Sequence, residues 1–314
     1  MTPRHLLATT SKSLLLIDGA SGAAHLIDGG RAHYFGISRG LGVYYVGNRG
    51  RSNTSPLPKD RERGKVLVFD AELRLTEELA APFALRDMHQ LLFHDGSLWV
   101  TCSFDNMVAV FDGRAWREWF PLGRPVAEPR DTHHFNSLTG FGDQLCVLAH
   151  NLGALTARGS ELHFFTLPDL QPAGVVALGA QAHNVWLHGS ELMTCSSGEG
   201  RLVGANGTVV ETGGFPRGVC RVGGETYVGL SEFAQRADRD DSRGQLLVFD
   251  AQWGRRRVID LDGQGMVTDL LALSAVEAQC ILDSGAQRET LSFPVLHDLP
   301  DAPVADESAE PVRW

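Results

Sequence analysis

Short apolar runs, each followed by a polar turn and a second β-prone run, recur along the whole chain. Six such segments begin at Ser13, Lys65, Met107, Glu161, Arg201 and Gln245. Their turns are rich in Asp, Gly, Ala or Asn, which is the pattern of a β-hairpin. No long stretch shows helical periodicity. The pattern therefore predicts an all-β chain that contains six hairpins.

A second set of apolar strands alternates with these hairpins, and a polar residue stands near the start of each strand. These anchor residues are His33, His89, Asn136, His183, Arg217 and Asp269. One anchor strand and one hairpin together make a four-stranded meander of about 40 to 50 residues, the repeat expected of a propeller blade. We therefore predict an all-β, six-bladed β-propeller.

The two ends of the chain are expected to share one blade. The first hairpin, residues 13–28, has no anchor strand before it, and the last anchor strand, which begins near Met266, has no hairpin after it. Joining them would close the ring without an exposed sheet edge. The remaining strand of that blade would come from the segment at Leu6 or from the one at Ala278. We expect a single propeller domain over residues 1–297 and an acidic, proline-rich tail over residues 298–314.

Composition narrows the classes of partner. The 314 residues carry a net charge of −10, and the longest basic run is Arg255–Arg257, so a surface that follows nucleic-acid phosphates is not expected. No segment approaches the roughly 20 apolar residues of a membrane helix. The amino terminus lacks the apolar stretch of a secretory signal, and the five cysteines form no CxxC pair. These features predict a cytoplasmic protein.

The anchor residues are also the candidate functional residues. In a four-stranded meander the innermost strand begins, and the second strand ends, on the same face, so both sets of residues should meet at the mouth of the central channel. A funnel mouth of mixed imidazole, amide, carboxylate and guanidinium groups is typical of a small-molecule site. We predict His183, His134 and His89 as catalytic residues, and Arg217, Asn136, Arg49, His150 and Glu232 as substrate-binding residues. Whether His33 and Asp269 join them stays open.

Two kinds of chemistry suit these residues. His89, His134 and His183 could hold one divalent transition metal, Zn, Fe, Ni or Cu, and leave a position open for substrate. Alternatively, the histidines and Arg217 clasp a small anionic molecule through charge-assisted hydrogen bonds. Both hypotheses describe an enzyme, whereas polar residues at this position can also serve only the channel backbone and water. Of the adjacent pair His133 and His134, we expect His134 to face the channel.

Two long insertions interrupt the repeat. They span residues 49–64 and 234–243, and both follow the second strand of a blade. They should therefore overhang the face on which the anchors lie. They could form a lid, or a surface that binds a protein partner, in which case the chain would be a non-enzymatic binding propeller.

Four motifs in a fixed order carry a resemblance to known proteins. They are MHQLLFHDGSLWVTCSF, the H-x-N-S of His134, Asn136 and Ser137, HNVWLHGSELMTCSSGEG, and FPRGVCRVGGETYVGLSE, which fall within residues 86–250. This set resembles an uncharacterised family of bacterial propeller-like proteins with a domain of unknown function, which implies the fold. More remotely, the H-x-N-S motif and the strand at His183 look like bacterial arylsulfotransferases. That resemblance implies group transfer through His183, with His89, His134, Asn136 and Arg217 around the sulfate.

Overall fold

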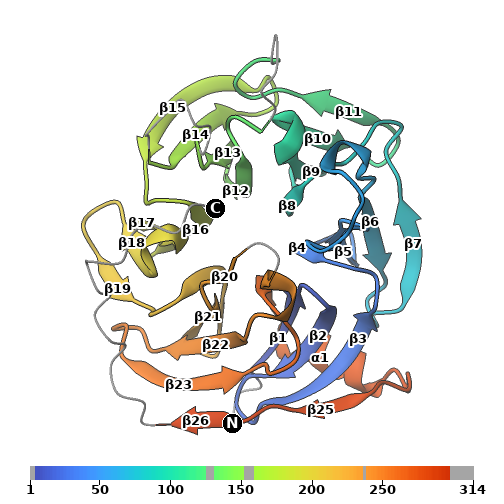
Figure 1. The fold of residues 1–314 in the computed structure, drawn as a ribbon, viewed down its shortest axis with the longest axis vertical. Coiled ribbons are helices and arrows are strands. Elements are labelled where there is room, and N and C mark those ends of the chain that lie inside the picture. The colour runs from blue at the N-terminus through green and yellow to red at the C-terminus, as the bar shows by residue number, and fades with distance from the viewer. Residues whose placement is uncertain (1–3, 125–130, 152–158, 236–237, 298–314) are drawn as a thin grey trace.

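The computed structural model describes residues 4–124, 131–151, 159–235 and 238–297. Six antiparallel sheets stand around a central axis, so the protein is the six-bladed β-propeller predicted from the sequence (Figure 1). The innermost strand of each blade contacts the innermost strands of its two neighbours. The tail over residues 298–314 lies outside the described residues.

Each blade is a meander whose strands follow one another outward from the axis. Blade 1 contains β4 (Tyr34–Gly40), β5 (Val43–Asn48), β6 (Lys65–Phe69) and β7 (Leu75–Leu79). Blade 2 contains β8 (Met88–His94), β9 (Ser97–Cys102), β10 (Met107–Phe111) and β11 (Trp116–Trp119). Blade 3 contains β12 (Phe135–Phe141), β13 (Gln144–Ala149), β14 (Glu161–Thr166) and β15 (Gln171–Ala177).

The remaining blades follow the same plan, and two of them gain a fifth strand. Blade 4 contains β16 (Ala182–His188), β17 (Glu191–Ser196), β18 (Arg201–Gly204) and β19 (Val209–Glu211). Blade 5 contains β20 (Phe215–Val222), β21 (Glu225–Ser231), β22 (Gly244–Phe249), β23 (Arg255–Asp260) and the added β26 (Val295–His297). Blade 6 contains β24 (Val267–Ala272), β1 (His5–Thr10), β2 (Ser13–Asp18), β3 (Ala23–Gly29) and the added β25 (Thr290–Ser292).

Blade 6 closes the ring from both parts of the chain, as predicted. Strand β1 pairs with β2 on one side and with β24 on the other, so the segment at Leu6 supplies the missing strand. The alternative at Ala278 is wrong, because that segment forms the helix α1 (Ala275–Asp283). A capping box begins this helix: the Ser274 hydroxyl accepts the Glu277 N–H, and the Glu277 carboxylate accepts the Ser274 N–H.

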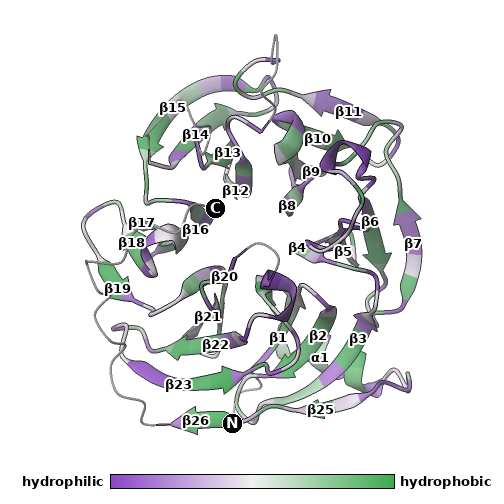
Figure 2. Cartoon of the chain, viewed as in Figure 1, coloured by the Kyte–Doolittle hydropathy of each residue, from purple (hydrophilic) through white to green (hydrophobic). Residues whose placement is uncertain are grey.

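The hydrophobic core lies between neighbouring blades. One cluster joins Leu7 and Leu16 of blade 6 to Ile37 and Val46 of blade 1, and similar clusters fill the other interfaces. Figure 2 shows many of the strands coloured as hydrophobic. Burial of both faces of each sheet explains why the strands are short apolar runs. Within the described residues, no helix has the length and apolar character needed to cross a bilayer.

A ring of polar side chains joins the innermost strands near their beginnings. The register of five of these strands is interrupted there by a bulge, which removes backbone N–H groups from the ladder. Side chains of neighbouring blades accept some of these groups: Ser137 accepts the N–H of Asn184 (2.7 Å), and Asn184 accepts the N–H of Gly218 (2.7 Å). Gly218 has a φ of +81°, and a Cβ there would lie 2.9 Å from the backbone of Asp269. Only glycine fits that close approach.

Asp269 is the centre of this polar ring. Its carboxylate accepts the N–H groups of Ile37 (3.2 Å) and Leu270 (3.0 Å) and the side-chain amides of Gln90 (3.3 Å) and Asn184 (3.0 Å). Burial raises the pKa of Asp269 against the opposing effect of these hydrogen bonds. One carboxylate thus links blades 1, 2, 4 and 6.

Replacement of Asp269 by Ala is expected to destabilise the propeller by at least about 3 kcal/mol, because each buried donor left without a partner costs about 1–3 kcal/mol. Equilibrium unfolding in urea measures this loss. The matched control is Asp262→Ala, at an exposed position in the loop that leads into the same blade, which should change stability by less than about 0.5 kcal/mol. Similar effects of the two substitutions would contradict the role given to Asp269.

Candidate functional site

The predicted anchors His89, Asn136, His183 and Arg217 lie on the successive innermost strands β8, β12, β16 and β20, each at the bulge of its strand. Blade 1 supplies Phe35 at this position. The predicted anchor of that blade, His33, lies just before β4 and is also buried. The predicted anchor of blade 6, Asp269, belongs to the polar ring described above.

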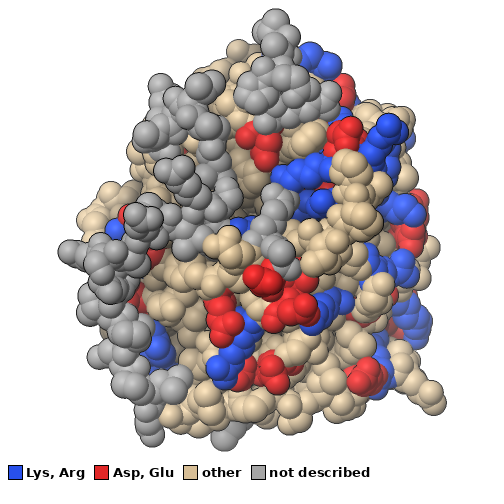
Figure 3. Space-filling model, viewed as in Figure 1, with Lys and Arg blue, Asp and Glu red and all other residues tan. Residues whose placement is uncertain are grey.

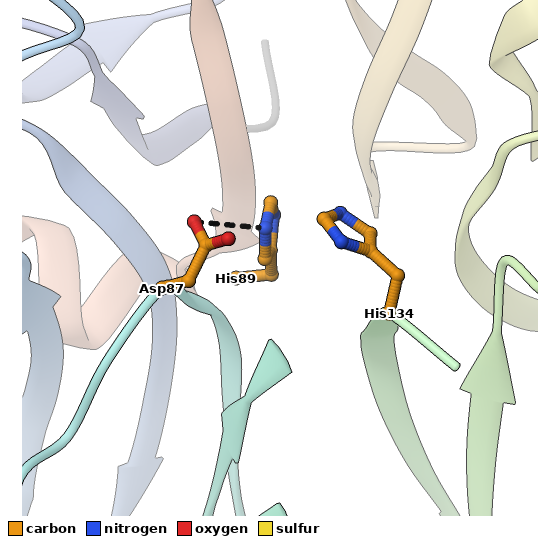
Figure 4. Close-up of side chains that lie close together, drawn as sticks. All are labelled: Asp87, His89 and His134. Atoms are coloured by element: carbon orange, nitrogen blue, oxygen red, sulfur yellow. Dashed lines mark ion pairs between the residues drawn. The ribbon is translucent and has the colours of Figure 1, made fainter. Parts of the chain in front are cut away.

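Four imidazole rings form a continuous row along the channel wall. The ring centroids of His89 and His134 are 4.6 Å apart, those of His134 and His150 are 4.9 Å apart, and those of His150 and His183 are 4.8 Å apart. Figure 4 shows His89 and His134 facing each other across a gap. Burial lowers the pKa of His89, His150 and His183 well below the ordinary value. These three side chains are therefore neutral at pH 7.

Asn136 fixes the orientation of two of these histidines. Its amide nitrogen donates to Nε2 of His183 (3.1 Å) and to Nε2 of His150. Nδ1 of His183 donates to the Ser197 hydroxyl (2.8 Å), which itself donates to the carbonyl of Pro216 (2.6 Å). Both ring nitrogens of His183 are thus engaged. This arrangement requires a neutral imidazole, in agreement with its lowered pKa.

Arg217 is a buried cation with no carboxylate partner among the described residues. It is 4% exposed, donates from Nη2 to Nδ1 of His89 (2.8 Å), and lies over the ring of Phe35 at 4.7 Å from the centroid. Burial lowers the pKa of Arg217 to about 9, so the guanidinium still carries its charge at pH 7. The more distant charges of Asp269 and Asp87 favour the charged form, but the groups in direct contact, Phe35 and a neutral histidine, offset little of the cost of burying it.

Arg49 lies over the same phenyl ring but, unlike Arg217, it is paired with carboxylates. Its guanidinium pairs with Glu62 through Nε (3.1 Å) and Nη2 (2.9 Å), and with Asp87 through Nη2 (2.8 Å). Burial would lower the pKa of Arg49, but the two carboxylates outweigh it and raise the pKa. Glu62 also accepts the backbone N–H of Asp87 (2.7 Å). The predicted substrate-binding residue Arg49 is thus already neutralised, whereas Arg217 is not.

Two carboxylates orient the histidines at the mouth. Nδ1 of His134 donates to Asp131 (2.7 Å), and Nε2 of His89 lies 3.5 Å from Asp87 (Figure 4). Lys59 lies between the two carboxylates, with its Nζ 2.6 Å from Asp87 and 3.5 Å from Asp131. Lys59 comes from the 3₁₀ helix Lys59–Arg61 in the first insertion. That insertion is therefore part of the site.

The metal hypothesis has one geometric candidate among the described residues. Possible ligand atoms of Asp87, His89 and His134 lie within 4.8 Å of one another. The third member of this group is thus Asp87, whereas the sequence predicted His183. The surroundings fit a divalent cation poorly. Arg49 and Lys59 already neutralise Asp87. Arg217 donates to Nδ1 of His89, which leaves the proton on Nε2, where a metal would need a lone pair.

The other predicted residues lie at the edge of this arrangement. Asp240 of the second insertion accepts from Nε2 of His33 and from the backbone N–H of Asn53 in the first insertion (2.9 Å). The two insertions thus meet, as expected, on the face that carries the anchors. Glu232 is exposed and accepts the backbone N–H of Arg243 (3.4 Å). His133 stacks on Phe135, while His134 turns toward His89.

Sequence reasoning missed several members of the site. These are Phe35, Lys59, Glu62, Asp87, Asp131 and Ser197. Two of them had a local signal, since an aspartate stands two residues before His89 and three residues before His134. Asp87 and His134 both adopt a left-handed conformation directly before an innermost strand, with φ of +53° and +50°. That turn brings both side chains to the channel mouth, although neither belongs to a strand.

Comparisons with known proteins support the fold. No protein-family model and no curated protein matches the sequence. Among solved structures, a protein of unknown function from Bacteroides caccae is 13% identical over 86% of this chain and 99% of its own, with a TM-score of 0.59. A chain of a nidogen/laminin complex gives the same four values.

One similar structure carries an enzyme description. It is described as "a putative 6-phosphogluconolactonase" from Bacteroides fragilis, and it is 15% identical over 87% of this chain and 98% of its own, with a TM-score of 0.54. At such low identity the similarity shows the propeller architecture alone. The resemblance to an uncharacterised propeller family is supported at the level of the fold, and the one to arylsulfotransferases stays a prediction.

The neutral histidines make stability depend on pH. In the unfolded chain a histidine has a pKa of about 6.5, above the lowered values of His89, His150 and His183 in the fold. The unfolded state therefore takes up more protons as the pH falls below about 6.5, and stability present above that pH is lost. Between pH 7.5 and 5.5 this loss amounts to about 1.4 kcal/mol for each of these histidines, or about 4 kcal/mol for the three. Urea unfolding at pH 7.5, 6.5 and 5.5 measures the loss, and His150→Phe should reduce it by about 1.4 kcal/mol. A flat profile would show that the histidines are not buried as neutral groups.

Proposed function

We propose that the protein is an enzyme that acts on a small anionic molecule at the channel mouth, with Arg217 as the group that binds the anion. The observation that carries this proposal is the buried guanidinium of Arg217, which has no carboxylate partner among the described residues. An unpaired buried charge costs several kcal/mol. A bound carboxylate, phosphate or sulfate would offset that cost through charge-assisted hydrogen bonds.

His134 is the residue best placed to act on the bound molecule. Its Nδ1–H is held by Asp131, so the lone pair lies on Nε2. This is the arrangement of a general base or a histidine nucleophile oriented by a carboxylate. The side chain of His134 is 13% exposed, which leaves it accessible from the mouth. Histidine-mediated group transfer, including the sulfotransferase-like alternative, would then proceed through His134.

His89 and His183 have different roles in this proposal. His89 carries its N–H at Nε2, because its Nδ1 accepts from Arg217. The contact of that N–H with Asp87 is long, 3.5 Å, so it can shift to donate to the anion or to charge that develops on it. Nε2 of His183 accepts from Asn136, so its lone pair is engaged. His183 as a nucleophile would first have to break that hydrogen bond. We therefore assign His183 and Asn136 to the orientation of the histidine row.

Metal-dependent chemistry is the second candidate, and it rests on the grouping of Asp87, His89 and His134. We expect elemental analysis of protein purified without a His-tag to find less than about a tenth of an equivalent of Zn, Fe, Ni or Cu, before and after reconstitution. The physical reason is the presence of Arg49 and Lys59 beside Asp87. One equivalent of metal, lost on Asp87→Asn substitution, would instead establish the metal site.

A binding propeller without catalysis is the third candidate, and it relies on the two insertions as a partner surface. Lys59 of the first insertion contacts Asp87 and Asp131, so deletion of residues 54–61 would disturb the small-molecule site as well. A cleaner test exchanges exposed residues of the same insertion, such as Leu57→Ser. Loss of partner capture with intact anion binding would favour the binding surface.

The two arginines over Phe35 give a matched test of anion binding. Arg217→Met should leave the protein folded, with a stability equal to or above that of the wild type, because it removes an unpaired buried charge. It should also abolish binding of acetate, sulfate and phosphate in calorimetric titration. Arg49→Met should destabilise the fold by about 3–5 kcal/mol, because Glu62 and Asp87 would lose their cation. Equal destabilisation by both substitutions, or unchanged anion binding in Arg217→Met, would contradict the assignment.

Turnover separates an enzyme from a binding protein. A panel of carboxylic acids, lactones, phosphate esters and sulfate esters should contain at least one compound that the wild type converts. Asp131→Asn should slow that conversion by about 10²–10⁴-fold, the usual contribution of an oriented acid–base residue. Anion binding without conversion of any compound would leave the protein as a ligand-binding propeller.

A further inference from the structure

Two buried polar atoms beside the histidine row, Oδ1 of Asn136 and Nδ1 of His150, have no hydrogen-bond partner among the described residues. A third buried atom, Nε2 of His89, makes only a long contact of 3.5 Å with Asp87. The three residues are 1–8% exposed. A buried polar atom without a partner costs about 1–3 kcal/mol, and native proteins contain few of them. Two unpartnered atoms and one weakly engaged N–H around the same row of rings point to a polar ligand.

The partners already present decide which of these atoms donate. Nδ1 of His89 accepts from Arg217, so its Nε2 carries the proton and donates. Nε2 of His150 accepts from Asn136, so its Nδ1 donates. The amide nitrogen of Asn136 serves two histidines, which leaves Oδ1 as an acceptor. His134 adds a second acceptor at Nε2, because Asp131 holds its Nδ1–H.

These residues match a ligand that carries both an anionic group and a hydrogen-bond donor. Arg217 and His89 together offer a positive charge and donors, which suit an anion. Asn136 and His134 offer acceptors, which need a hydrogen-bond donor on the same molecule. The row is compact, since the His89 and His134 centroids are 4.6 Å apart. Anion and donor must therefore be close together in a small molecule.

Resting on the function proposed above, we infer that the substrate is a small hydroxycarboxylic acid or a derivative of one. The planar carboxylate matches the fork of the Arg217 guanidinium, and its single negative charge matches the one charge of that guanidinium. The hydroxyl donates to Nε2 of His134 or to Oδ1 of Asn136, and its oxygen accepts from Nδ1 of His150. An ammonium group in place of the hydroxyl would bring a second cation beside Arg217, which disfavours amino acids.

A hydroxyl that donates to one of these acceptors should increase the affinity of the site for the acid. A site built to hydrogen-bond a hydroxyl rejects the analogue that lacks it, because its own buried groups are then left unpaired. The inference therefore predicts a difference between molecules of the same charge and nearly the same size. That difference is independent of whether the site binds anions at all.

The experiment is a calorimetric titration of the wild-type protein with matched pairs of acids. The pairs are glycolate and acetate, each lactate enantiomer and propanoate, and 3-hydroxybutanoate and butanoate. At least one hydroxy acid should bind about tenfold or more tightly than its partner without the hydroxyl. Methyl lactate, which keeps the hydroxyl and loses the charge, should bind at least as weakly as propanoate. Arg217→Met should lose both members of the preferred pair.

Different results would overturn the hydroxy-acid inference and the proposed anion binding at Arg217. Equal affinity for the two members of every pair would overturn the hydroxy-acid inference and leave anion binding at Arg217 intact. Absence of binding by every acid, at concentrations up to tens of millimolar, would overturn the proposed function and the inference with it. Methyl lactate binding as tightly as lactate would show that the hydroxyl is recognised without the carboxylate, and this too would overturn the inference.

Discussion

The bulge near the start of the innermost strands is the constraint on which the fold and the site both depend. It withdraws backbone N–H groups from the strand ladder, and buried N–H groups need other acceptors. Side chains of neighbouring blades supply these acceptors, with Asp269 at the centre. The same bulge places His89, Asn136, His183 and Arg217 around the axis. The polar ring that holds the blades together is therefore directly adjacent along the chain to the residues of the candidate site.

Electrostatic balance distinguishes the parts of this site. Arg49, Glu62, Asp87, Lys59 and Asp131 form a connected group in which each charge has an opposite partner. Burial holds His89, His150 and His183 neutral. Arg217 stands apart, because it contacts an aromatic ring and a neutral imidazole and forms no ion pair among the described residues, although the nearby charges of Asp269 and Asp87 raise its pKa. On the face shown in Figure 3, the acidic and basic side chains of the described residues are interspersed and form no extended patch of one sign. The uncompensated positive charge at Arg217 is thus confined to one residue, which suits a small anion better than an extended polyanion.

The repeat made the architecture predictable, because hairpin patterns and anchor strands alternate along the chain and both ends lack a partner. Convergence of His89, Asn136, His183 and Arg217 followed from the same register. Phe35 escaped prediction because an apolar residue at an anchor position looks like core. Asp87 and His134 lie in left-handed turns before their strands, and strand periodicity gives no information there. Lys59 comes from a loop whose path depends on tertiary contacts, and so does the pairing that neutralises Arg49.

The state of Arg217 is the point on which the functional account depends. The most direct measurement is NMR of the arginine Nε–H resonances during titration with lactate, with Arg49 as the internal reference. The account predicts a saturable shift of the Arg217 resonance and a much smaller change at Arg49, whose guanidinium is already paired with Glu62 and Asp87. An Arg217 resonance that stays unchanged, or equal shifts at the two arginines, would contradict the claim that Arg217 is the anion-binding group.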